Sequence, residues 1–140
     1  MLEPMTDDIF EKILTGEVPA EVVYEDEQTF AFLDIAPNNP GHTLVISKKH
    51  FLNIFDADAD AFSAVMRTVH KLAPVIKKAV HADGVNIHMN NDPGAGQVVP
   101  HLHVHIIPRH EGDGFTLWHG TPYEAGVDKE TAQKIRAGLV

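Results

Sequence analysis

The segment HLHVHIIPRH at residues 101–110 constrains the fold more than any other part of the sequence. Histidines occupy every second position from 101 to 105, and apolar residues stand between them. Alternate residues of a β-strand share one face and lie about 6.8 Å apart. The pattern therefore predicts a strand, entered through Pro100, with a histidine face and an apolar core face. The histidine face holds His101, His103 and His105.

Three histidines on one face indicate chemistry, because solvent-facing strand faces seldom consist of histidine. The outer two would lie roughly 13 Å apart, whereas a zinc ion binds nitrogens about 2 Å away. The whole row is therefore not expected to ligate one ion, although two neighbours could contribute to a metal site. A neutral imidazole is a nucleophile and an acid or base near neutral pH, and a hydrogen bond at one ring nitrogen sets its tautomer. A solvated polar face is the alternative.

The remaining pattern predicts an α+β fold, in which antiparallel strands surround one long helix. A short helix is expected to begin near Thr6, Asp7 and Asp8 and to stop near Gly16. Helical spacing over residues 57–81 predicts the long helix, with a kink or a break at Pro74. Further strands are expected at 21–25, 29–35, 42–47 and 84–90, and a C-terminal helix at 128–138. We also expect Trp118 to be packed.

Composition limits the classes of protein to which this chain can belong. A length of 140 residues with 44% hydrophobic content predicts a single domain over 1–140. The net charge of −9 argues against a protein that binds duplex nucleic acid, because such proteins need a basic surface. Cysteine is absent, so the chain contains no disulfide and no thiolate site. The sequence shows no secretory leader and no membrane span, and we expect a cytoplasmic location.

Three blocks of the sequence resemble the histidine-triad family. GQVVPHLHVHIIPR at 96–109 is similar to the family signature His-φ-His-φ-His-φ-φ, where φ is apolar. FLDIAPNNPGHTLVISKKH at 32–50 and DIFEKILTGEVPAEVVYEDE at 8–27 resemble two further family blocks. The resemblance covers residues 8–112 and leaves 113–140 as a C-terminal extension. It implies an antiparallel sheet of about five strands with one long and one short helix, and a homodimer whose sheets join across the two-fold axis.

The resemblance also implies a purine nucleotide pocket and attack on an α-phosphate. His103 would be the nucleophile, flanked by His101 and His105 and joined by His42. Asp34 would accept hydrogen bonds from the ribose hydroxyls. The implied base pocket consists of Phe10, Phe32, Leu33 and Ile35, and the implied phosphate contacts are Asn90, Gly96 and Gln97. Other roles stay open at several of these positions: the apolar residues could be plain core, Asp34 could cap a turn, and Asn90 and Gln97 could stabilise their own loop.

Two positions depart from the family pattern. Val98 stands where many members have serine, which leaves the turnover rate and the preferred leaving group open. Several bacterial members hold a structural zinc with two cysteines and two histidines, but here Asp8 and Glu11 replace the cysteines beside His50 and His101. Carboxylates prefer harder ions and are stable in water, so we expect this cluster to be empty of metal and no cofactor to be required. The carboxylates would then face solvent or accept hydrogen bonds from the histidines.

The function implied by these observations is hydrolysis of a purine nucleotide at its α-phosphate through a nucleotidyl-histidine intermediate. Nucleoside phosphoramidates such as AMP conjugates are the first substrate class, and dinucleoside polyphosphates are the second. Two other classes stay open, namely a nucleotide-binding regulatory protein with little turnover and a metal-binding module built on the histidine cluster. No nucleic acid or membrane is expected as a partner.

Overall fold

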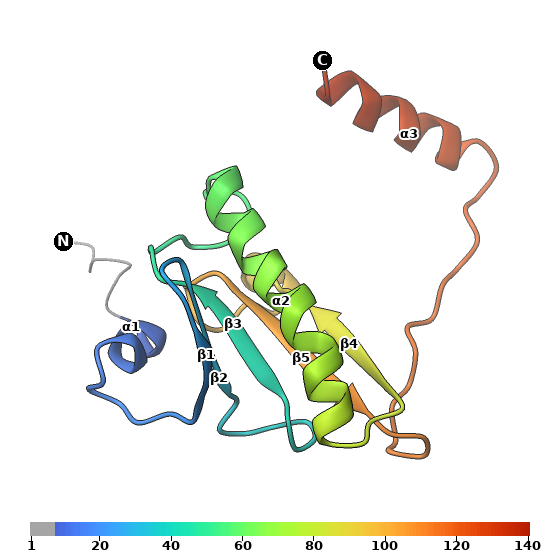
Figure 1. The fold of residues 1–140 in the computed structure, drawn as a ribbon. Helices are drawn as coiled ribbons and strands as arrows, with labels where there is room; N and C mark the ends of the chain where they lie inside the picture. The colour runs from blue at the N-terminus through green and yellow to red at the C-terminus, as the bar shows by residue number, and fades with distance from the viewer. Residues whose placement is uncertain (1–7) are drawn as a thin grey trace.

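The computed structural model describes residues 8–140, which form a five-stranded sheet with three α-helices and one short 3₁₀ helix (Figure 1). The elements are α1 (Ile9–Leu14), β1 (Val22–Glu25), β2 (Thr29–Leu33), β3 (Thr43–Ser47), α2 (Ala59–Ala79), β4 (Gly84–His88), η1 (Pro93–Ala95), β5 (His103–Arg109) and α3 (Val127–Gly138). The sheet order is β1-β2-β3-β5-β4, and all neighbouring strands are antiparallel. The expected α+β architecture is therefore confirmed.

The histidine row begins before its strand, which corrects the prediction that all three histidines lie on one strand. β5 starts at His103, whose partner on β3 is Ile46. The His101 amide instead donates to the Val99 carbonyl at 2.9 Å, and the Leu102 amide donates to the Phe51 carbonyl at 2.8 Å. These bonds turn the chain before it joins the sheet, so His101 leaves the line of the strand.

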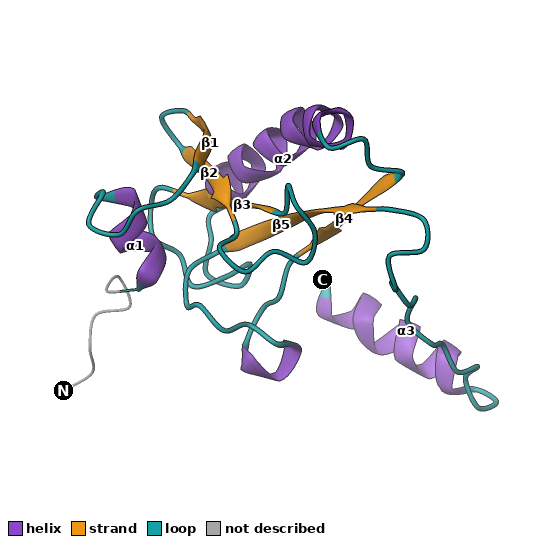
Figure 2. Cartoon of the chain, turned by 90° about the horizontal axis from the view of Figure 1, so that it is seen from below, coloured by secondary structure: helices purple, strands orange, loops and turns teal. Residues whose placement is uncertain are grey.

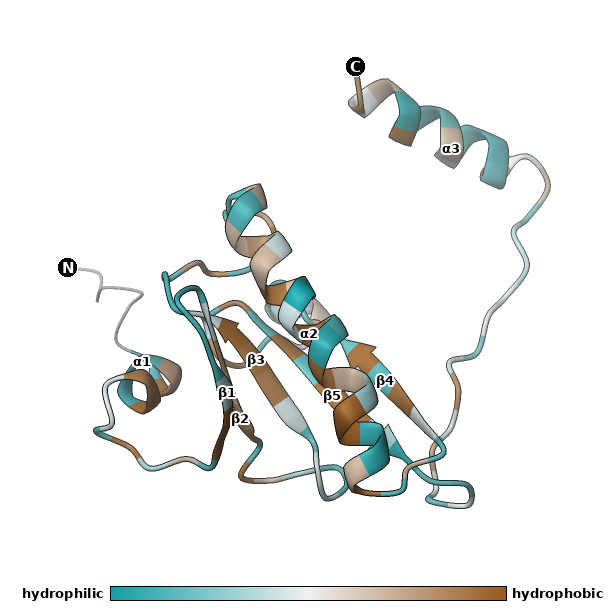
Figure 3. Ribbon diagram, in the orientation of Figure 1, coloured by the Kyte–Doolittle hydropathy of each residue, from teal (hydrophilic) through white to brown (hydrophobic). Residues whose placement is uncertain are grey.

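The two faces of the sheet have separate hydrophobic clusters. Helix α2 covers one face, as Figures 1 and 2 show, and Figure 3 colours most of the neighbouring strand β3 as hydrophobic. The cluster under α2 includes Val65 and Val69 of the helix with Val104 and Ile106 of β5. The apolar stripe of the long helix therefore packs in the chain's own core. The other cluster consists of Phe10, Phe30, Phe32, Leu44 and Ile46.

The structure bears on two local predictions about the helices. Helix α2 continues through Pro74, so the expected break is absent. The proline removes one amide donor, but Pro74 and His70, whose carbonyl loses that donor, are both exposed, so water can replace the bond. Helix α1 is capped by Asp8, which accepts a hydrogen bond from the Glu11 amide at 2.8 Å. Thr6 and Asp7, which were expected at this cap, lie outside the described residues.

The C-terminal segment runs away from the sheet after β5 (Figure 1). Arg109 binds Asp113 at 2.9 Å and lies over the ring of Phe115 at 4.6 Å, and these contacts anchor the beginning of the segment. Helix α3 follows within one residue of its predicted start and contains no buried residue. Trp118 is 90% exposed, so the prediction that it is packed is wrong for the described chain. No helix of residues 8–140 is long and apolar enough to cross a membrane.

Candidate active site

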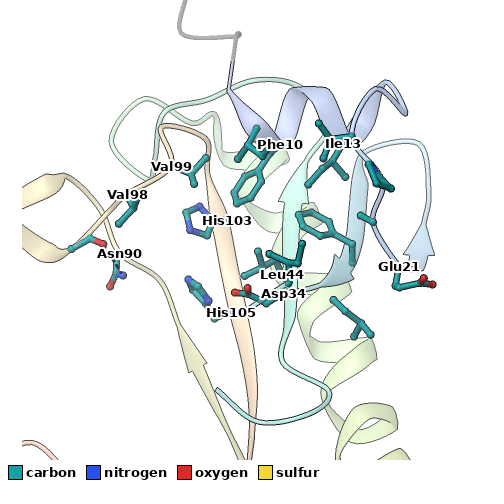
Figure 4. Close-up of a pocket in the computed structure, with 18 residues that line it drawn as sticks. Phe10, Ile13, Glu21, Asp34, Leu44, Asn90, Val98, Val99, His103 and His105 are labelled. Atoms are coloured by element: carbon teal, nitrogen blue, oxygen red, sulfur yellow. Dashed lines mark hydrogen bonds between the residues drawn. The ribbon is translucent and has the colours of Figure 1, made fainter. Parts of the chain in front are cut away.

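A cavity of about 550 Å³ opens on the sheet face opposite α2, and Figure 4 shows its lining side chains. It brings together residues that are far apart in the sequence. Nine of the residues implied by the resemblance line it: Phe10, Phe32, Leu33, Asp34, Ile35, Asn90, Gly96, His103 and His105. Gln97 and His101 are not among the lining residues, and His42 lies directly behind His105.

The apolar wall of the cavity is also part of the core. The rings of Phe10 and Phe32 meet edge to face with centroids 5.5 Å apart, and Phe10 meets the His103 ring in the same way at 5.0 Å. Both phenylalanines are buried, whereas Ile35 is 97% exposed at the rim. Phe10 and Phe32 therefore serve both as core residues and as cavity lining, because both belong to the second hydrophobic cluster and both line the cavity. Such a slot suits a flat aromatic ring.

The hydrogen bonds of His103 determine its tautomer. Its Nδ1 lies 2.6 Å from the His101 carbonyl oxygen, which can only accept, so Nδ1 carries the hydrogen. Burial lowers the pKa of His103 below its ordinary value of 6.5, which keeps the ring neutral near pH 7. A neutral ring with hydrogen on Nδ1 has a lone pair on Nε2. Figure 4 shows this ring projecting into the cavity between Phe10 and His105.

His105 and His42 form a second ordered pair. The Asn38 amide donates to Nδ1 of His42 at 3.0 Å, so this nitrogen is an acceptor and the His42 hydrogen is on Nε2. That Nε2–H points at Nδ1 of His105, 2.9 Å away. His105 is then left with its hydrogen on Nε2, the ring nitrogen not engaged by His42. Burial lowers the pKa of His42, and burial lowers the pKa of His105 to about 4, so both rings are neutral near pH 7.

The two facing histidines therefore present opposite functions to the cavity. His103 offers a lone pair and His105 offers an N–H donor, and their ring centroids lie 5.1 Å apart. A nucleophile beside a hydrogen-bond donor is the arrangement required for displacement at an electrophilic centre whose leaving group gains charge.

Asp34 lies at the edge of the cavity, where both suggested roles are compatible. One carboxylate oxygen accepts a hydrogen bond from the Ala36 amide at 2.9 Å, so Asp34 does cap a turn. The other oxygen lies 3.6 Å from Nε2 of His42. Each oxygen keeps a further lone pair for a ligand hydroxyl.

The loop before β5 is held together by Gln97, whose side chain does not line the cavity. Its amide nitrogen donates to the carbonyls of Leu52 at 2.7 Å and Val99 at 3.0 Å. Its oxygen accepts from the Asn53 side chain at 3.0 Å and the Asp92 amide at 2.8 Å. All four positions are used, so the side chain stabilises the loop and the predicted phosphate contact is not supported.

Backbone groups of the same loop remain available at the cavity. Gly96 adopts a left-handed conformation with φ of 92°, which turns the chain after η1. Val98 and Val99 both line the cavity, and their amide groups have no acceptor among residues 8–140. Neighbouring free N–H groups form an anion-binding surface. The Val98 side chain, which replaces the usual serine, is 90% exposed.

His101 lies beneath the site instead of lining it. It is fully buried, with Nε2 donating to the Ser47 carbonyl at 2.8 Å and Nδ1 3.2 Å from the Asp8 carboxylate. Its backbone carbonyl is the group that orients His103. His101 therefore connects the cap of α1 to His103, and its ring does not line the cavity.

Asp8, Glu11, His50 and His101 lie together, with one candidate ligand atom of each within 4.8 Å of the others. The Asp8 carboxylate is 3.2 Å from His101 and 3.6 Å from His50, and His101 is 3.6 Å from Glu11. A zinc tetrahedron with arms of about 2.1 Å has edges of ~3.4 Å, so the spacing fits a metal. One contact argues against a metal. Nε2 of His50 lies 3.0 Å from the Pro100 carbonyl, which only accepts hydrogen bonds, so this nitrogen carries a hydrogen and has no lone pair for an ion.

Two polar groups of the site were missed by sequence reasoning. The backbone of Asn38 orients His42, and no side-chain pattern reports a backbone donor. His88 stands opposite His105 in the β4–β5 register. The alternation of GVNIHMN placed His88 on the same face as Asn90, but alternation does not show which strand is the neighbour.

Comparison with known proteins identifies the family. The HIT domain family matches residues 15–112. An uncharacterized HIT-like protein of Methanocaldococcus jannaschii is 48% identical over 86% of this chain and 93% of its own length. The adenylylsulfatase HINT3 of Arabidopsis thaliana is 36% identical over 92% of this chain and 66% of its own. The crystal structure of SMU.412c from Streptococcus mutans has a TM-score of 0.90 at 37% identity, covering 100% of this chain and 90% of that one. The chain belongs to the HIT domain family.

Proposed function

We propose that this protein hydrolyses purine nucleotides at the α-phosphate through a covalent nucleotidyl-His103 intermediate. The single observation that carries the proposal is the tautomer of His103. The His101 carbonyl holds the hydrogen on Nδ1, and burial lowers the pKa of the ring, so a neutral Nε2 faces the cavity. An imidazole nitrogen with a free lone pair is the nucleophile that phosphoryl transfer requires.

The nucleotide fits the cavity in one direction. The base lies in the slot of Phe10 and Phe32, and the ribose hydroxyls meet Asp34. The α-phosphate then reaches the two histidines and the free amides of Val98 and Val99. Positioning and stabilisation of charge at phosphorus account for most of the catalysis in this type of reaction.

The reaction proceeds in two displacements. Nε2 of His103 forms a bond to the α-phosphorus as the bond from phosphorus to the leaving amine breaks. The amine takes up one proton from solvent, and the Nε2–H of His105 donates a hydrogen bond that stabilises the departing nitrogen. Water then attacks phosphorus, the bond to His103 breaks, and the water gives up one proton. Proton uptake and release balance, and both histidines return to their starting tautomers. The route requires no cofactor.

Nucleoside phosphoramidates are the proposed substrate class, because the Nε2–H of His105 can donate a hydrogen bond to the departing amine. Dinucleoside polyphosphates are the alternative class. The name of the relative HINT3, an adenylylsulfatase, supports the α-phosphate as the point of cleavage and adds adenylyl sulfate to the conjugates worth testing. A binding protein with little turnover would retain the cavity, and Val98 in place of serine is the feature that favours it.

The test compares His103→Asn with His70→Asn, a matched change at an exposed position of α2. Turnover of adenosine phosphoramidate should fall by at least ~10³-fold in the first variant, since its only nucleophile is lost, and should be unchanged in the second. Affinity for AMP should persist in both. His103→Gly should recover some turnover when imidazole is added. Near-normal turnover in His103→Asn would refute the mechanism, and an inactive wild type that binds AMP would favour the regulatory alternative.

A further inference from the structure

His88 is the histidine beside the active site that the proposed mechanism does not use. It ends β4 and pairs in register with His105 on β5. The two rings meet edge to face with centroids 5.6 Å apart. His88 does not line the nucleotide cavity, but Asn90, two residues further along the chain, does.

The hydrogen bonds of Asn90 have only one consistent arrangement. Its amide nitrogen lies 3.3 Å from the Gly96 carbonyl oxygen, which can only accept. The other end of the amide is therefore the oxygen, and it lies 2.9 Å from Nε2 of His88. An amide oxygen also only accepts, so His88 must carry its hydrogen on Nε2.

This arrangement leaves one hydrogen of Asn90 unused. The amide nitrogen has two N–H groups, and Gly96 accepts one of them. Figure 4 shows Asn90 beside Val98, across His103 and His105 from Asp34. The second N–H is thus at the end of the cavity where the proposed phosphate contacts lie, next to the free amides of Val98 and Val99.

We propose that His88 is a positioning residue that fixes the Asn90 amide so that its N–H, and not its oxygen, faces the phosphate of the nucleotide. Without a donor at position 88, only the longer bond of 3.3 Å to the Gly96 carbonyl holds the amide. The amide can then turn by half a rotation and direct its oxygen at an anion, which is repulsive. The inference rests on the proposed function, which identifies the ligand as a nucleotide. The hydrogen bond between His88 and Asn90 itself is present in the protein without a ligand.

The test uses His88→Leu, which removes the donor, and His88→Gln, which keeps an N–H₂ donor at a similar reach. One hydrogen bond is worth a factor of about three to ten. We expect His88→Leu to lower kcat/KM for adenosine phosphoramidate and the affinity for AMP by that factor, while His88→Gln stays within about twofold of the wild type. Asn86→Leu, a change on the same strand and face, is the matched control and should have no effect.

A double-mutant cycle with Asn90→Ala separates this role from a direct effect on His105 or a general loss of structure. If His88 acts through Asn90, adding His88→Leu to Asn90→Ala should cause no further loss. A further three- to tenfold loss in the Asn90→Ala background, or an equal loss in His88→Gln, overturns the proposal. Thermal unfolding checks that each variant folds, and His88→Met replaces His88→Leu if that variant does not.

An inactive wild type would count against the proposed function and not against this inference. AMP affinity measured by calorimetry would still report the orientation of Asn90, because AMP carries the phosphate. Equal AMP affinity in the wild type and in His88→Leu would then refute the positioning role.

Discussion

Asp8 performs two tasks with its two carboxylate oxygens, and two substitutions separate them. Oδ1 caps α1 by accepting from the Glu11 amide at 2.8 Å. Oδ2 lies 3.2 Å from Nδ1 of the buried His101. Asp8→Asn keeps a good capping side chain but removes the charge, because asparagine caps helices about as well as aspartate. Asp8→Ala removes both.

The expected losses follow from the burial of this contact. The Asp8 side chain is 3% exposed and the His101 side chain 0%, so solvent screens their hydrogen bond very little. A hydrogen bond to a charged group contributes about 1.5–3 kcal/mol, and a helix cap contributes about 1 kcal/mol. For a domain of this size 1 kcal/mol corresponds to roughly 4 °C in melting temperature. The asparagine amide can donate to Nδ1 of a neutral His101, a bond worth about 1 kcal/mol, so Asp8→Asn should lower Tm by about 2–8 °C and Asp8→Ala by about 10–16 °C.

Thermal unfolding followed by far-ultraviolet circular dichroism measures these shifts, and the chain supplies its own control. Asp58 caps α2 by accepting from the Ala61 amide at 2.8 Å, but it has no histidine partner. Asp58→Asn should lower Tm by less than ~2 °C, while Asp58→Ala should lower it by about 4 °C. If Asp8→Asn and Asp58→Asn melt alike, the contact between Asp8 and His101 does not stabilise the fold and the reasoning is refuted.

Three further predictions concern metal, pH and assembly. Elemental analysis of protein purified without a metal-affinity tag should find no stoichiometric zinc at the Asp8 cluster, and a chelator-sensitive Tm would reverse that interpretation. Burial lowers the pKa of His103, and lowers that of His105 to about 4. In the proposed mechanism the neutral rings are the active forms, so the acid limb of kcat/KM should lie below the ordinary histidine value of 6.5. An acid limb at 6.5, measured on folded protein, contradicts this. Sedimentation at micromolar concentration should give about twice 15.4 kDa, and a monomer would contradict the homodimer.

The exposed edge of the sheet, and not the apolar stripe of the long helix, is the surface that favours the homodimer implied by the family resemblance. The apolar stripe of α2 packs on its own sheet, so it is not free for a partner. β4 is an edge strand and its Ile87 is 45% exposed. An unpaired strand edge with an apolar side chain is a surface on which a second sheet can continue.

Periodicity predicted the elements well because each is specified by its own residues. Alternation located β4, and helical spacing located α2 within two residues of its observed ends. The start of β5 was missed because two carbonyls from outside the strand, those of Phe51 and Val99, take the amides of Leu102 and His101. Such long-range partners leave no mark on the spacing of the histidines.

The chemistry of the site was predictable only in part for the same reason. The pattern placed His103 and His105 on one face, and family resemblance added His42. The division of roles between them comes from the His101 carbonyl and the Asn38 amide. Backbone groups of this kind belong to the fold: any residue at position 101 has the carbonyl, and any residue except proline at position 38 has the amide. Gln97 shows the converse, because its residue type suited a ligand contact while the loop used all its hydrogen-bonding positions.

The exposed position of Trp118 determines what tryptophan fluorescence reports about this protein. The chain contains one tryptophan, and its side chain is 90% exposed on the segment that leaves the sheet (Figure 1). Its emission in the folded monomer should already be that of an indole in water, so unfolding of the sheet should change it little. A shift to shorter wavelength would require another surface to cover the segment. The emission maximum would therefore monitor association of the C-terminal segment and would be a poor monitor of unfolding.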